Sequence, residues 1–249
     1  MQIIINKYFT ILNFRTVTVL VLSVLITYLS YHFKIDFNVD MTLLSIAIIF
    51  PLVFSIRGSF RRRENALEHL SEFKSSLSTI RYFLLSKPEL VDQFKDEVDT
   101  ILKTINDSAI DHLSDKIKDI SKVDNAMNKV YEFMLNHSDV FTRQIRDKVF
   151  RFMKDTHESF ENLNAIHIHR TPVSLKAYCL VFIYIFPLIY SPEVIKNVGY
   201  NSTWIVYGVV LFTQFILVSL YNIQNQLEYP FDNFGNDDID LDNFKLDRS

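Results

Sequence analysis

Apolar residues along the chain gather in four segments that are almost free of charge. Each segment approaches the ~20 residues that cross the hydrocarbon core of a bilayer. The pattern therefore predicts four transmembrane helices, at residues 17–33, 41–56, 175–195 and 203–223. Pro187 interrupts the third segment, and Pro192 and Glu193 mark its expected end.

The long segment between the second and third spans is polar and predicts helices. Phe73, Leu77 and Ile80 recur at the three- and four-residue spacing that puts side chains on one face of a helix. Gly58 is the only weak helix former between residues 56 and 86, so the second span is expected to continue into one long helix. Ser138 is expected to cap a later helix.

Positive charge is distributed unevenly around these spans. Four arginines follow the second span, whereas the short connections 34–40 and 196–202 contain one lysine each. The positive-inside rule then places both termini and the polar middle in the cytoplasm, with the spans in the cell (inner) membrane. The predicted fold is an all-α membrane protein with a helical cytoplasmic domain inserted between the second and third spans. Its expected parts are residues 1–58, 59–170, 171–223 and 224–249.

The basic cluster after the second span has one expected class of partner. The net charge is -3, and the cluster adjoins a membrane helix, so lipid head groups or permeant anions are favoured over nucleic acid. The cluster consists of Arg57, Arg61, Arg62 and Arg63. The sequence contains no phosphate-binding loop and no arrangement of nucleophile and base, so we do not expect an enzyme.

The second span carries an apolar stripe. Ile46, Phe50, Phe54 and Arg57 share one face at helical spacing. If several copies surrounded an axis, an apolar stripe that ends in a cation is what an anion pore would need. Ordinary helix packing explains the same stripe, and the residues alone favour packing.

Carboxylates gather after the last span, at residues 225–244. Asp238, Asp240 and Asp242 match the first ligands of an EF-hand, but Asn243 and Ser249 stand where glycine and glutamate are required. An EF-hand is therefore excluded, and a looser calcium site stays open. From Asp242 onward we expect a solvated tail.

The ending "NIQNQLEYPFDNFGNDDIDLD" resembles the end of the last helix in the bestrophin family. The order of spans resembles that family as well. The resemblance implies a homopentamer around a central pore that passes chloride or other small anions. It also implies an apolar pore neck on the second span, formed by Ile46, Phe50, Phe54 and Gly58.

Three departures mark the chain as a divergent relative. "SFRRRENALEHL" replaces an Arg-Trp-Trp stretch, Asn236 stands where a glutamate is usual, and Tyr229 replaces an asparagine. The resemblance places a calcium clasp at Asp237 and Asp240, although many bacterial relatives are thought to work without calcium. We therefore predict no cofactor, with calcium at these two aspartates as the alternative.

The leading functional hypothesis is a bestrophin-like oligomeric anion channel. The alternative is a non-conducting membrane scaffold or sensor whose cytoplasmic helices bind a protein partner. The large polar region and the absent aromatic motif favour that alternative.

Overall fold

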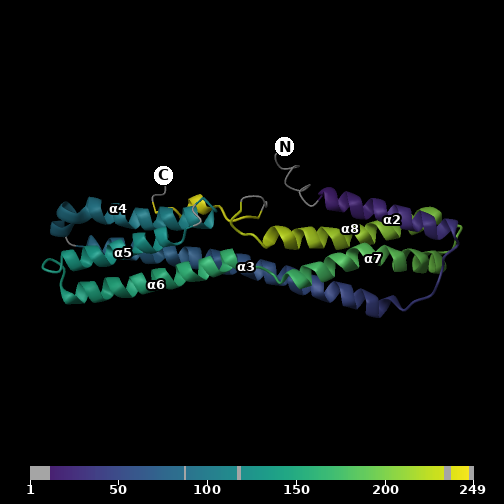
Figure 1. Ribbon diagram of the computed structural model, residues 1–249, viewed down its shortest axis with the longest axis horizontal. Coiled ribbons are helices and arrows are strands. Elements are labelled where there is room, and N and C mark those ends of the chain that lie inside the picture. The colour runs from purple at the N-terminus through teal and green to yellow at the C-terminus, as the bar shows by residue number, and fades with distance from the viewer. Residues whose placement is uncertain (1–11, 87, 117–118, 233–236, 247–249) are drawn as a thin grey trace. The chain divides into compact units, whose positions relative to one another are not determined.

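The computed structural model describes residues 12–86, 88–116, 119–232 and 237–246. All the regular elements in these ranges are helices (Figure 1). In chain order they are α2 (Phe14–His32), α3 (Met41–Leu84), α4 (Pro88–Leu113), α5 (Ser121–Asn136), α6 (Arg143–Ile168), α7 (Val173–Val198), α8 (Thr203–Leu227) and the 3-10 helix η2 (Leu241–Phe244).

The chain folds as two compact units. The first contains the described parts of residues 1–61 and 170–228, and the second contains those of 62–169 and 229–249. Within the described residues, four helices are long and apolar enough to cross a membrane, which confirms the four predicted spans. These spans are α2, the first part of α3, α7 and α8.

The first unit is tied together at the beginning of α2. Asn13 and Thr16 form a capping box, in which the Asn13 side chain accepts a hydrogen bond from the Thr16 amide at 3.0 Å. Asn222 of α8 donates to the Thr16 hydroxyl at 2.9 Å. The cap thus joins the start of α2 to the last turns of α8.

Helix α7 does not end where the sequence predicts. It continues to Val198 with both Pro187 and Pro192 inside it. The buried Glu193 carboxylate accepts hydrogen bonds from the Val39 amide and the Asn197 side chain, both at 2.7 Å. The prediction failed because packing against α2 and α8 supports a helix that proline would end in water.

Helix α3 is one continuous helix of 44 residues, as predicted from Gly58 being the only weak helix former between residues 56 and 86. A Cβ atom on Gly58 would meet nothing within 4 Å. Packing inside the chain therefore does not require glycine there, although glycine costs about 1 kcal/mol relative to alanine in a helix.

The second unit has an apolar core of its own. Phe73, Leu77 and Ile80 of α3 are buried in it, as their spacing predicted. They pack with buried residues of the other three helices, among them Val98, Leu102, Ile105, Met127, Val130, Met153 and Phe160. Arg81 of α3 also donates two hydrogen bonds to the Asp99 carboxylate of α4, at 2.7 and 2.9 Å.

The predicted cap at Ser138 is wrong. Helix α6 begins at Arg143 after Thr142, and Thr142 makes no side-chain cap hydrogen bond. Phe141 is buried against Phe94 and Phe133, with ring centroids 5.6 Å apart in both pairs. This contact holds the chain in a turn, so the helix starts later than its local sequence suggests.

The C-terminal segment is not a solvated tail from Asp242 on. Leu241 is buried in the core of the second unit, and Lys74 donates to the Asn243 carbonyl at 3.0 Å. The Asn106 side chain donates to the Phe244 carbonyl at 3.2 Å and accepts from the Leu246 amide at 3.1 Å. These contacts come from residues more than a hundred positions away, which is why composition alone misled the prediction.

The packed segment yields a stability prediction. Phe231→Ala and Leu241→Ala should each lower the free energy of unfolding by about 2–5 kcal/mol, because each removes a buried apolar side chain. Denaturant unfolding followed by circular dichroism measures this change. The control is Asp237→Ala, whose exposed side chain should matter by less than about 0.5 kcal/mol. Equal, small effects for all three variants would contradict the packing.

Candidate functional site

The predicted stripe on α3 lies on the face of that helix that the first unit leaves uncovered. Phe50 is 54% exposed and Phe54 is 60% exposed, and Ile46 is also exposed. The opposite face packs into the unit through Ile48 and Leu52, which are both buried against α7 and α8. Ordinary packing inside one chain therefore does not account for the stripe.

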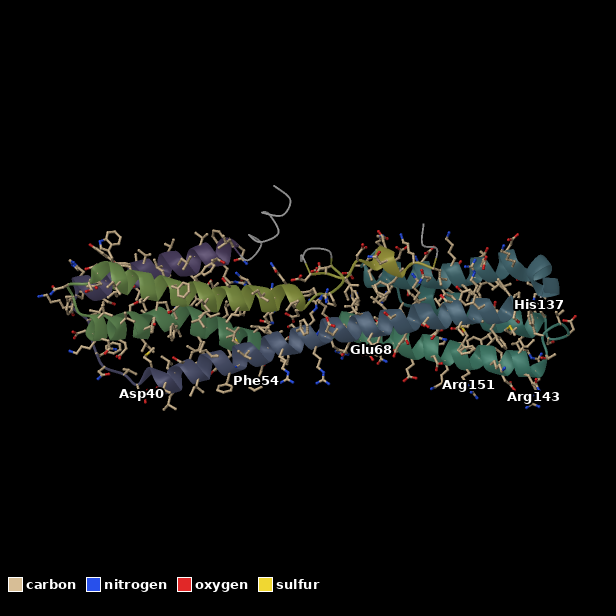
Figure 2. All side chains as sticks on the ribbon, turned by 180° about the vertical axis from the view of Figure 1, so that it is seen from behind. Asp40, Phe54, Glu68, His137, Arg143 and Arg151 are labelled. Carbon is tan, nitrogen blue, oxygen red and sulfur yellow. The ribbon has the colours of Figure 1, made fainter. Side chains whose placement is uncertain are left out.

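The two phenylalanines form a continuous aromatic surface. Their ring centroids are 6.0 Å apart and the rings are nearly parallel, at 27°. Figure 2 shows Phe54 pointing away from the rest of the first unit. Val53 is exposed beside them and extends the same surface, which sequence reasoning did not include.

Pro51 lies between the two phenylalanines in sequence and is half-buried at the edge of this apolar face. A proline at this position removes the N–H that would otherwise bond to the Ala47 carbonyl. The Tyr178 hydroxyl of α7 donates to that carbonyl at 3.2 Å. The sequence analysis missed Tyr178. Its signal in the sequence is Pro51, which leaves a carbonyl on α3 without an N–H partner, but the sequence does not show which residue of another helix supplies the donor.

The four arginines of the predicted basic cluster separate into two pairs. Arg57 and Arg61 are exposed, four residues apart on the same side of α3 as the phenylalanines. Neither makes a hydrogen bond or ion pair within the described part of the chain. They are therefore free to act on an ion or a lipid head group.

Arg62 and Arg63 are occupied inside the second unit. Arg62 donates to the carbonyls of Ile166 and His169 at the end of α6. Arg63 donates to the Asp237 carbonyl at 2.5 Å and forms an ion pair with Glu64 at 3.0 Å. These two arginines stabilise the second unit. Of the predicted cluster of four, only Arg57 and Arg61 therefore remain as a candidate ion site.

The charge on α3 then reverses. Glu64 and Glu68 follow Arg61 at spacings of three and seven residues, and both are exposed. Along the exposed side of α3, apolar residues are thus followed first by basic and then by acidic residues. The sequence analysis included neither Glu64 nor Glu68 among the candidate site residues.

The calcium alternative at Asp237 and Asp240 stays a prediction, and the structure shows the contacts that these two aspartates make in the chain. Asp240 caps η2, and its carboxylate accepts from the Asp242 amide at 3.1 Å and from the Asn243 side chain at 2.9 Å. Asp237 contributes its carbonyl to Arg63, and its side chain is exposed. In the described ranges no three acidic, histidine or cysteine side chains gather as metal ligands, and Gly235 and Asn236 lie outside those ranges.

The carboxylate of Asp242 also stabilises the turn in which it lies. A hydrogen bond from Lys245 and the charge of that ammonium lower the pKa of Asp242. The two groups are 2.7 Å apart. Asp240 and Asp242 after the last span therefore organise their own short helix.

The division of the arginines predicts unequal effects on stability. Arg62→Ala should lower the free energy of unfolding by about 1–3 kcal/mol, because it leaves the carbonyls at the end of α6 without a charged donor. The neighbouring Arg61→Ala is the matched control and should change it by less than about 0.5 kcal/mol. Thermal unfolding in detergent measures both variants, and an equal loss for the two would contradict the division.

Comparison with known proteins gives one consistent result. No family model matches the chain, and a search of curated proteins finds no match. Solved structures do match. A variant of a bacterial bestrophin homologue from Klebsiella pneumoniae aligns with a TM-score of 0.76 at 14% identity, covering 93% of each chain.

Two further structures agree with this alignment. Another structure of the Klebsiella pneumoniae homologue gives a TM-score of 0.73 at 15% identity over 93% of each chain. A structure described as a membrane protein gives 0.75 at 14% identity, covering 93% of this chain and 95% of that one. At this identity the likeness concerns the fold, and the four apolar helices agree with it. By its fold, this chain is similar to bacterial bestrophin homologues, and its four apolar helices support an integral membrane protein.

Proposed function

We propose that this chain is the subunit of an oligomeric channel for chloride or other small anions, with the exposed face of α3 lining the pore. The main observation behind the proposal is the order of residues along that face, where apolar rings are followed by a basic side chain. Phe50 and Phe54 are large, apolar and uncovered, and Arg57 follows within one turn with no partner in the described residues. Lipid is an alternative cover for both the rings and the guanidinium groups, and the ion-flux measurement distinguishes it from a pore.

One α3 helix cannot enclose a pathway, so the proposal requires several copies around an axis. A homopentamer is the assembly that bestrophin resemblance implies. Rings of Ile46, Phe50 and Phe54 would then form an apolar neck that excludes water until it widens. Gly58 would keep the end of that neck free of side chains, and its Cβ position meets nothing inside the protomer.

Arg57 and Arg61 would supply the selectivity. Rings of exposed guanidinium groups beside a narrow apolar passage raise the local concentration of anions. Glu64 and Glu68 lie further along the same helix and would oppose this effect. Selectivity would therefore depend on which of the two charged bands lies nearer the narrowest point.

The proposed placement follows from the same charges. Arginines after the second span favour the cytoplasmic side of the inner membrane for the second unit and for both termini. Arg57 and Arg61 are also near enough to the end of an apolar helix to meet lipid head groups. No part of this role is catalytic.

A second candidate is a non-conducting scaffold or sensor. The observation in its favour is that the second unit contains a complete apolar core and exposes charged helices to solvent. Such a unit could dock a protein partner without any pore.

Ion flux distinguishes the two candidates. The protein is reconstituted in liposomes, and chloride flux is measured for the wild type, Phe50→Ala and Phe54→Ala. Smaller side chains in an apolar neck should lower the barrier, so flux should rise about tenfold, equal to ~1.4 kcal/mol. The matched control is Phe212→Ala on α8, since Phe212 is 65% exposed and lines a surface with Val24 and Tyr28 of α2.

The reversal potential is measured in the same experiment, for the wild type and for Arg57→Gln. Arg57→Gln should shift permeability away from chloride, because it removes a ring of positive charge from the pathway. Flux that is absent, or unaltered by both neck variants, would contradict the pore and favour the scaffold.

A further inference from the structure

The apolar core of the first unit is divided into two clusters along its helices. One cluster includes Val19 of α2, Phe186 of α7 and Leu217 of α8. The other includes Val194 of α7 and Val210 of α8, with Tyr31 of α2 packed against it. On each of the three helices, a short stretch separates the two clusters.

Buried polar side chains occupy these stretches. They are Ser23 and Thr27 on α2, Ser191 on α7 and Gln214 on α8, and none of them is more than 1% exposed. We call these four residues the polar layer. A polar layer in an apolar core is costly unless its groups are hydrogen-bonded.

Two contacts place the members of the polar layer at one level. The hydroxyls of Thr27 and Ser191 are 3.0 Å apart. Thr213 donates to the Tyr190 hydroxyl at 3.3 Å. Because these two residues directly precede Gln214 and Ser191, the amide side chain and the hydroxyl pair are at the same height in the bundle.

Each of the three hydroxyl groups already donates its proton to a hydrogen bond. Ser23 donates to the Val19 carbonyl at 2.7 Å, and Thr27 donates to the Ser23 carbonyl at 2.8 Å. Ser191 must then be the donor in its contact with Thr27. The hydroxyls of the polar layer therefore have lone pairs to offer but no further protons.

The remaining member of the polar layer, Gln214, brings both hydrogen-bond donors and an acceptor. Both polar atoms of the Gln214 side chain are buried without a hydrogen-bond partner in the described chain. The carboxamide offers two N–H donors, while its own oxygen has no donor within the polar layer.

We propose that the polar layer is an internal hydration site, in which an ordered water molecule donates to the Gln214 oxygen and bonds to the hydroxyl groups beside it. Buried waters commonly make about three hydrogen bonds to polar groups that otherwise have no partner. Water suits this site because it supplies donors and acceptors together. The proposal is independent of ion conduction.

The test uses the full-length protein in detergent or nanodiscs, at a resolution that shows ordered water. Density is expected beside the Gln214 side chain, between α2, α7 and α8. In Gln214→Met, which keeps a similar volume but removes the amide, the density should disappear. The melting temperature should fall by about 2–4 °C, the shift expected for the loss of about one net hydrogen bond in a chain of this length.

A matched control and two opposite outcomes complete the test. Thr18→Val alters an exposed threonine on the same α2 helix and should leave both the density and the melting temperature unchanged. A dry polar layer would overturn the proposal, and Gln214→Met would then raise the melting temperature by removing an unsatisfied amide. Stability that depends on sodium rather than potassium or choline would also overturn it, because the guest would then be a cation.

Discussion

Inside a bilayer, a backbone carbonyl that loses its N–H partner has no bulk water to replace it, and the first unit is built around that constraint. Three of its prolines, Pro51, Pro187 and Pro192, lie within apolar helices. At the first of these, the Tyr178 hydroxyl bonds to the freed Ala47 carbonyl. The bond replaces the N–H that Pro51 lacks, and α3 is continuous through this position.

Continuity of α3 gives its two faces different roles. One face packs into the core of each unit, through Leu52 in the first and Leu77 in the second. The other face leaves Phe50 and Phe54 uncovered, followed by unpaired Arg57. The proposed channel uses this second face, since several copies around a common axis would bring the apolar residues and the arginines together.

Periodicity in the sequence predicted the helices and their buried faces. Contacts between residues far apart in the chain were missed. Hydropathy located the four spans, and helical spacing identified Leu77 and Ile80 as core. The sequence could not separate Arg62 from Arg61, because the carbonyls that bind Arg62 come from the end of α6, about a hundred residues away. The ordered segment after Asp242 was missed for the same reason, since its partner Asn106 is on α4.

The central claim is that the exposed face of α3 surrounds an axis formed by identical chains. Native mass spectrometry of the detergent-purified, full-length protein measures the number of chains directly. The account predicts a single species of five subunits. A monomer or dimer that persists across mild detergents and nanodiscs would contradict it, because neither can enclose a central pathway with α3.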